Sequence, residues 1–264
     1  EGSGETTAQS AFFKFISAPH GHPDRAITTL YLGGIRREAL IEPAARDDVR
    51  RFLTAAHRRG LLVEFLCGDS RWAQKENHEE ALGFLRAVLS FNRAAPAPAR
   101  FDGFQYDVEP YLLKEWPAPA LRRDFLRLFE RARAEVDAGA PRGLPRLVLG
   151  AAVPFWFDQE KLEWLDRAVL DRVDYLALMD YVNNAPALIE RAAGEIAYAG
   201  KIKKRIVIGM ETQRLKDEPT ATFFAEGNSA MERAVSAAAR QYGKTPGFGG
   251  FAIHHLTSYR TFAP

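Results

Sequence analysis

Short apolar runs with the character of β-strands alternate with amphipathic segments along almost the whole chain, and no other feature constrains the fold as strongly. Eight runs have the length and apolar content of buried strands: residues 12–17, 28–33, 61–67, 101–109, 147–154, 173–181, 205–211 and 249–255. Five segments between them carry apolar residues at three- and four-residue spacing, which predicts helices at residues 46–59, 76–91, 121–138, 185–199 and 229–242. The chain is therefore an α/β protein built from repeated strand and helix units.

Eight such units in 264 residues predict a single (β/α)8 TIM barrel, a fold that usually takes about 250 residues. An open, doubly wound sheet is the rival architecture. It is disfavoured because residues 17–23, after the first run, lack the glycine spacing of a nucleotide-binding loop. We expect residues 1–10 to form a disordered tail and residues 11–264 to form one catalytic barrel domain.

Composition excludes several classes of partner. The 36 basic and 34 acidic residues nearly balance and the basic ones are scattered over predicted helices, so we expect no nucleic-acid site. Cys67 is the single cysteine, which excludes a disulfide framework, and no apolar run approaches the ~20 residues of a membrane span. We expect a monomer without cofactor or metal. The compartment stays open, with a secreted or periplasmic location favoured if the chain is a processed mature form.

Two carboxylates end the fourth run, where Asp107 and Glu109 are spaced one residue apart. Side chains alternate along a strand, so Gln105, Asp107 and Glu109 share one face, and we expect Asp107 to hydrogen-bond to Glu109. Two neighbouring buried acids push their pKa values apart, which can leave one of them protonated and able to act as an acid. The alternative is that Asp107 and Glu109 simply lie in solvent where the strand ends. The polar and aromatic residues at the other strand ends disfavour this alternative.

The active site of a barrel lies at the carboxyl ends of its strands, and in this sequence those ends are rich in polar and aromatic residues. They supply Asp69, Arg71, Trp72, Trp156, Asp158, Asp180, Tyr181, Asn183, Glu211, Gln213, His254 and His255. We predict Asp69, Arg71, Gln105, Asp180 and Glu211 as substrate-binding residues. Trp72 and Trp156 are candidate platforms for sugar rings. One of the two consecutive histidines can face the lumen, and we interpret His255 as a hydrogen-bonding wall residue.

The fourth run resembles the signature of glycoside hydrolase family 18, the chitinase-like barrels, which is Asp-Gly-x-Asp-x-Asp-x-Glu. Asp102, Gly103, Asp107 and Glu109 match it, whereas Gln105 stands where the family has an aspartate. The segment Met179-Asp180-Tyr181 resembles the family's Met-x-Tyr motif. The resemblance implies that Glu109 is the general acid, that Asp107 holds the substrate's N-acetyl group, and that Tyr181 supports the developing oxazolinium ion. It also implies an oligo- or polysaccharide substrate that contains amino sugars.

Two other functions fit the same residues. Retaining glycosidases of the large barrel clan place an acid/base glutamate at the end of strand four and a nucleophilic glutamate at the end of strand seven, and Glu109 and Glu211 fit that layout. That clan usually has asparagine before the first glutamate, where this chain has Val108. A non-catalytic carbohydrate-binding barrel is the third possibility, and Gln105 is compatible with it.

Overall fold

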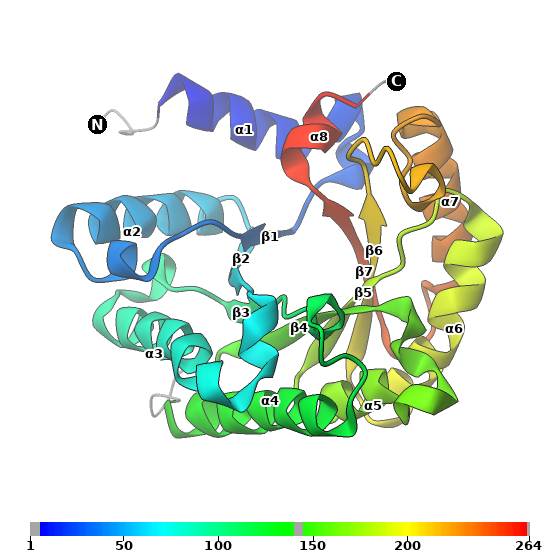
Figure 1. The fold of residues 1–264 in the computed structure, drawn as a ribbon. Coiled ribbons are helices and arrows are strands. Elements are labelled where there is room, and N and C mark those ends of the chain that lie inside the picture. Colours follow the sequence, from blue (N-terminus) through cyan, green and yellow to red (C-terminus); the bar gives the residue numbers. More distant parts are fainter. Residues whose placement is uncertain (1–5, 140–144, 263–264) are drawn as a thin grey trace.

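The protein is built on one curled sheet of seven parallel strands. We describe residues 6–139 and 145–262 of a computed structural model. In these residues each strand pairs with the next one along the chain (Figure 1). The strands are β1 (Thr29–Leu32), β2 (Leu62–Cys67), β3 (Gly103–Tyr106), β4 (Val148–Pro154), β5 (Tyr175–Met179), β6 (Arg205–Glu211) and β7 (Phe248–His254).

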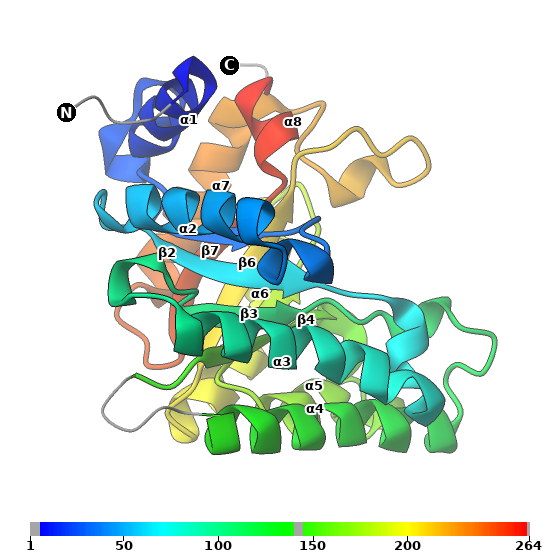
Figure 2. The ribbon, with the colours of Figure 1, turned by 90° about the vertical axis from the view of Figure 1, so that its left-hand side faces the viewer.

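Helices surround the outer face of this sheet. They are α2 (Pro43–His57), α3 (His78–Ala94), α4 (Pro119–Gly139), α5 (Leu165–Leu170), α6 (Ala185–Lys201) and α7 (Gly227–Tyr242). Figure 2 shows α2, α3 and α4 stacked along one side of the sheet. A parallel sheet curled inside a ring of helices is the architecture of a (β/α)8 barrel, and this confirms the predicted fold class. In the part of the chain that the structure describes, no helix is both long and apolar enough to cross a membrane.

One predicted strand is wrong. Residues 12–17 belong to the helix α1 (Thr7–Ser17), whose Phe13 and Ile16 are buried on one face. A capping box begins this helix, because the side chain of Thr6 accepts from the Gln9 amide and Gln9 bonds back to Thr6. The helix also shortens the predicted tail: residues 7–10 are its first turn, while residues 1–5 lie outside the described part. The run predicted as the fourth strand is consequently β3.

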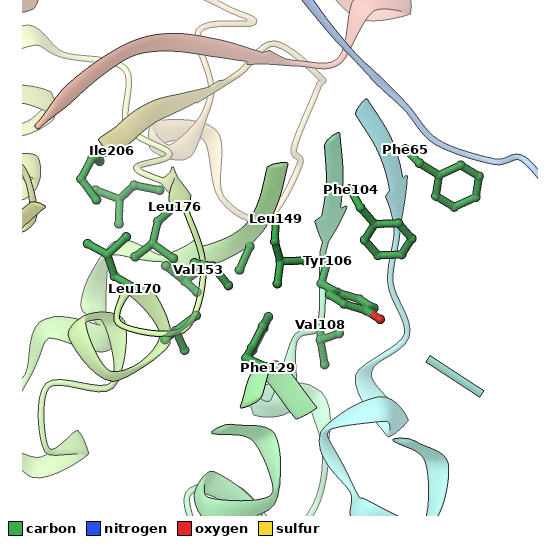
Figure 3. Close-up of a cluster of buried hydrophobic side chains, with 14 of the residues drawn as sticks. Phe65, Phe104, Tyr106, Val108, Phe129, Leu149, Val153, Leu170, Leu176 and Ile206 are labelled. Atoms are coloured by element: carbon green, nitrogen blue, oxygen red, sulfur yellow. The ribbon is translucent and has the colours of Figure 1, made fainter. Parts of the chain in front are cut away.

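The main hydrophobic core lies between the sheet and the helices. Figure 3 shows its side chains converging from strands β2 to β6 and from α4. Phe65 and Phe104 stack with ring centroids 5.5 Å apart, and the buried hydroxyl of Tyr106 donates to the Ala81 carbonyl at 3.0 Å. Since residues 104 and 106 pack outward, alternation turns Gln105 and then Asp107 toward the lumen.

The lower lumen holds a polar network among small residues. The Tyr175 hydroxyl lies 2.6 Å from Glu64 Oε2 and 2.8 Å from Gln105 Oε1. One hydroxyl has a single proton to donate, so it donates to one of these two oxygens at a time, and burial raises the pKa of Glu64 to about 7. Glycine is required at position 150, because an added Cβ would lie 2.2 Å from the Tyr175 ring.

Aspartates before two strands tie neighbouring strands together at the opposite, amino-terminal end of the barrel. Asp102 accepts from the Val63 amide at 2.7 Å and contacts His57 of α2 at 2.9 Å. Asp174 accepts from the Leu149 amide at 2.8 Å in the same way. The Asp102 of the sequence motif is therefore a structural residue, far down the strand from the carboxyl ends.

A seam separates the two edge strands, since no ladder joins β1 to β7 in the described ranges. Helix α1 and the short helix α8 (Leu256–Arg260) meet at this seam (Figure 1). The ring of Phe15 packs edge-on against Tyr259 at 5.7 Å, and His20 Nε2 lies 2.9 Å from the Tyr259 carbonyl oxygen. Arg25, after α1, pairs with Glu232 of α7 at 2.7 Å. We call these contacts the α1–α8 clasp.

Candidate active site

An open cleft of about 360 Å³ lies at the carboxyl ends of β1, β2 and β3. Its lining includes three of the residues predicted for the site, Asp69, Asp107 and Glu109. The cleft depends on Gly68, because a Cβ at that position would come within 1.7 Å of the Asp107 carbonyl oxygen. Close packing of β2 against β3 therefore brings the predicted acids to one wall of the cleft.

Asp107 is a mostly buried carboxyl group with unused hydrogen-bonding capacity. Its Oδ1 has no hydrogen-bond partner among the described residues. Burial and the neighbouring charge of Glu109 raise the pKa of Asp107 to about 6, against an opposing effect of His254. Asp107 can therefore exchange a proton near neutral pH, and its buried Oδ1 has an unused acceptor position.

Glu109 is held by a residue that the sequence analysis did not single out. The Tyr111 hydroxyl donates a hydrogen bond to Glu109 Oε2. The expected hydrogen bond between Asp107 and Glu109 is not present among the described contacts, so that prediction is wrong for this structure. The two groups interact through their charges instead.

Glu211, the last residue of β6, lies at the same carboxyl-terminal end of the barrel, which we call the mouth, and is 3 % exposed. It accepts hydrogen bonds from the amides of Thr212 at 2.7 Å and Gln213 at 2.6 Å, and its Oε2 pairs with His254 Nδ1 at 2.7 Å. Burial raises its pKa, but the bonds from His254 and the two amides outweigh that effect and leave the pKa lowered. Glu211 is therefore a stably ionised group whose oxygens already have partners.

Tyr181 and His254 complete the mouth. Their rings stack with centroids 6.2 Å apart. Burial is the main cause of a raised pKa at Tyr181, and the charges of Glu211, Asp107 and Glu109 add to it. The hydrogen bond to Glu211 raises the pKa of His254, whose side chain is 51 % exposed. The structure thus brings Asp107, Glu109, Tyr181 and Glu211 together.

Three predicted substrate-binding residues do not face the mouth. Trp72 is 3 % exposed and packs outward against Phe84 and Tyr106, so it offers no surface to a sugar ring. Asp180 is fully buried on the outer face of β5, 3.8 Å from Arg191 of α6, because alternation turns it away from Tyr181. Gln105 is 5 % exposed and is occupied by Tyr175 below the mouth.

The histidine assignment is also wrong. His255 begins α8 and its Nδ1 lies 2.9 Å from Ser258 Oγ, whereas His254 is the histidine that meets Glu211. An irregularity between Ile206 and Val207 in the pairing of β6 with β7 shifts the register, and Gly250 there has a φ of +110°. A bulge of this kind resets the alternation of side chains, which the sequence pattern alone does not display.

Three further predicted residues lie around the cleft. Asp69 binds Arg71 through two nitrogens, with Nη2 2.7 Å from Oδ2, and this pairing lowers the pKa of Asp69. Trp156 packs edge-on against Tyr111, with ring centroids 5.2 Å apart. The binding roles of Asp69, Arg71 and Trp156 stay predictions. In the described ranges, no group of three or more histidine, cysteine or acidic side chains is arranged to hold a metal ion.

Tyr111 was not predicted as a site residue, and His254 was not predicted as the histidine that faces the lumen. A signal existed for Tyr111: Pro110 forces a turn directly after Glu109, and an aromatic hydroxyl two residues past an acid can fold back onto it. The turn is the short segment η7 (Pro110–Leu112).

Comparison with known proteins supports the fold and leaves the activity open. No family model matches the chain, and no curated protein sequence matches it. Among solved structures, a chitinase from Chromobacterium violaceum has a TM-score of 0.55 at 15% identity, covering 98% of this chain and 94% of that one. A family 18 chitinase from Cycas revoluta, in complex with allosamidin, has a TM-score of 0.55 at 15% identity over 88% of both chains.

An endo-β-N-acetylglucosaminidase from Cordyceps militaris has a TM-score of 0.50 at 14% identity, covering 90% of this chain and 80% of that one. At such identities the likeness establishes a divergent chitinase-like fold. A fold does not determine an activity, which depends on the residues at this chain's own site.

Proposed function

We propose that the protein is a glycoside hydrolase that cleaves a polysaccharide containing N-acetylated amino sugars, with Glu109 as general acid/base assisted by Asp107. The observation that carries this proposal is that Asp107 and Glu109 line one open cleft at the strand ends of a barrel with a chitinase-like fold. The position of this cleft is the one at which barrels of this architecture carry out their chemistry.

The proposed reaction uses the substrate as its own nucleophile. Glu109 donates its proton to the glycosidic oxygen, and the bond from that oxygen to the anomeric carbon breaks, its electron pair going to the oxygen. The carbonyl oxygen of the N-acetyl group attacks the anomeric carbon and forms an oxazolinium ion. Water then attacks the same carbon and gives a proton to Glu109, while the bond from that carbon to the acetamido oxygen breaks and its electron pair returns to the oxygen. The N-acetyl group, the acid and the proton count are thereby restored.

Asp107 and Tyr181 are suited to the acetamido group. Asp107 lines the cleft, so its carboxylate can accept from the amide N–H of the substrate, and an ionised Asp107 stabilises the positive oxazolinium ion. Tyr181 lies within the influence of Asp107, Glu109 and Glu211. Its hydroxyl, kept protonated by a raised pKa, can donate to the acetamido carbonyl.

The two-carboxylate alternative finds less support. A nucleophilic Glu211 would need an oxygen free to attack the anomeric carbon, but its carboxylate is engaged by His254 and by two backbone amides. Glu211 is better suited to hold His254 in its charged form. This arrangement favours substrate assistance over a covalent glycosyl-enzyme.

The test compares hydrolysis of chitotetraose and cellotetraose by the wild type, by Glu109→Gln and by Glu130→Gln. Glu130 is an exposed glutamate paired with Arg172 at 2.6 Å on the outer ring, so it is a matched control. We expect wild-type activity on chitotetraose alone, a loss of about 10²–10⁴-fold in Glu109→Gln, and normal activity in Glu130→Gln. A wild type that binds chitotetraose without cleaving it would identify a carbohydrate-binding barrel instead.

A further inference from the structure

Tyr111 is fixed beside Glu109 by an aromatic cage. Its ring meets Trp156 edge-on at 5.2 Å and Phe157 at 6.3 Å. Trp116 closes the cage by stacking on Phe157 at 5.5 Å and meeting Trp156 at 6.0 Å. The contacts with Trp156 and Phe157 restrict the ring of Tyr111, so its hydroxyl is held toward Glu109 before any substrate arrives.

The contact selects one oxygen of the acid. Tyr111 donates to Oε2 of Glu109, and an oxygen that accepts this bond is the poorer site for the proton of the carboxyl group. The transferable proton is therefore carried by Oε1. No described hydrogen bond joins Asp107 to Glu109. We therefore assign the orientation of the acid to Tyr111, whose hydroxyl does bond to it.

We propose that Tyr111 is a positioning residue for Glu109, which directs the acid's proton to Oε1 and stabilises the carboxylate that remains after proton transfer. This inference rests on the proposed hydrolytic function. In the protonated form of Glu109 that catalyses this step, negative charge grows on the carboxyl group as the proton leaves, so a donor already aimed at Oε2 helps the transition state more than the ground state. Tyr111 itself neither gains nor loses a proton in this step.

Leaving groups of different basicity test this role. A sugar leaving group needs full protonation by the acid, whereas a nitrophenolate departs with little help. In Tyr111→Phe we expect kcat for chitotetraose to fall about 10- to 100-fold and kcat for nitrophenyl chitobioside to fall about threefold or less. KM for both substrates should stay near the wild-type value. A merely structural role would lower both rates together.

Tyr198→Phe is the matched control, because Tyr198 donates to the carboxylate of Asp171 at 2.7 Å on the outside of the barrel. This substitution removes the same kind of bond and should leave both rates unchanged. Equal losses on the two substrates in Tyr111→Phe, or a change in KM alone, would overturn the positioning role.

A second measurement separates this inference from the proposed function. Burial, the hydrogen bond to Glu109 and the charge of Glu109 raise the pKa of Tyr111. In a tyrosine-labelled sample studied by NMR without substrate, Glu109→Gln should move the hydroxyl-proton resonance of Tyr111 upfield, because a neutral amide is a weaker acceptor than a carboxylate. The resonance is identified by its loss in Tyr111→Phe. A wild type that cleaves no glycan defeats the proposed function even when this shift is present, while an unchanged Tyr111 resonance defeats the positioning role.

Discussion

The mouth of the barrel and the space beneath helices α5 and α6 both contain buried carboxyl groups, but they treat these groups in opposite ways. At the mouth, Glu211 receives two amide bonds and His254, and Glu109 receives the Tyr111 hydroxyl. Beneath the helices, Asp166, Asp180 and Glu195 are at most 1 % exposed. Each has at least one oxygen without a hydrogen-bond partner in the described residues.

The difference between these two regions shows that burial of a carboxyl group does not by itself mark a functional residue. Burial raises the pKa of Asp180 to about 7 and that of Glu195 to about 8, although neither group lies at the cleft. Glu211 is also buried, yet its donors leave its pKa lowered. A raised pKa alone therefore does not identify the active site. The adjoining cleft and the donors aimed at Glu109 and Glu211 distinguish the mouth, where Asp107 resembles the acids under the helices in having an oxygen without a described partner.

The largest expected effect compares one isosteric change in the two regions. Asp107→Asn should lower kcat for chitotetraose by about 10²-fold or more, because it removes the charge that stabilises the oxazolinium ion. Asp180→Asn, the same change under α6, should leave kcat unchanged. Steady-state kinetics on both purified variants provides the measurement. Equal losses would mean that the two groups of acids act as one unit and would remove the distinction drawn above.

The next effect concerns stability and pH. Glu195 and Asp180 keep their protons in the folded protein up to pH values near 8 and 7, whereas unfolding exposes carboxyls that ionise near their ordinary pKa values. The folded state then binds more protons, so the free energy of unfolding falls as pH rises from about 5 to 8, by at most about 1.4 kcal/mol per pH unit for each group.

Glu195→Gln should reduce this slope by up to that amount, as measured by denaturant unfolding at several pH values. The charged groups around the cluster are Arg167 of α5, Arg191 of α6 and Asp158, and Tyr242 of α7 also lies near it. None of them is changed by the substitution. A variant with the wild-type slope would show that Glu195 is ionised inside the protein.

The smallest effect tests the donors at the mouth. Glu211→Gln removes the main cause of the raised pKa of His254, so the histidine NMR titration should move to lower pH. We expect the free energy of unfolding to fall by about 1 kcal/mol between the ordinary pKa values of glutamate and histidine, where both wild-type groups are charged.

This loss of stability is confined to that pH range because the pKa shifts of Glu211 and His254 have opposite signs. The contribution of Glu211, whose pKa is lowered, is present above its ordinary pKa and disappears as pH falls. That of His254, whose pKa is raised, is present below its ordinary pKa and disappears as pH rises through the raised value. An unmoved His254 titration would contradict the pairing.

Much of this arrangement was predictable from the sequence. Apolar runs located the seven strands, and alternation placed Asp107 and Glu109 at the carboxyl end of a barrel strand. The segment 12–17 misled the prediction because its phenylalanines suit a strand as well as a helix. The Thr6 and Gln9 capping box upstream was the sign of a helix.

The rest depended on geometry that composition does not encode. The bulge near Gly250 decides which of two adjacent histidines faces Glu211. The turn at Pro110 decides that Tyr111 folds back onto Glu109. Trp72 comes shortly after β2, where an aromatic side chain could stack on a sugar ring. The segment η4 (Ser70–Ala73) directs its ring into the core instead. Turns and bulges choose which of the nearby side chains reach the cleft.

The α1–α8 clasp determines how the molecule responds to a mechanical load. A closed barrel would resist separation of neighbouring strands with a row of backbone hydrogen bonds loaded together. Here ring contacts, the bond between His20 and the Tyr259 carbonyl, and the ion pair between Arg25 and Glu232 bear that load. We expect a force that pulls α1 away from α8 to break such contacts one after another, so that the seam opens before any ladder from β1 to β7 is lost.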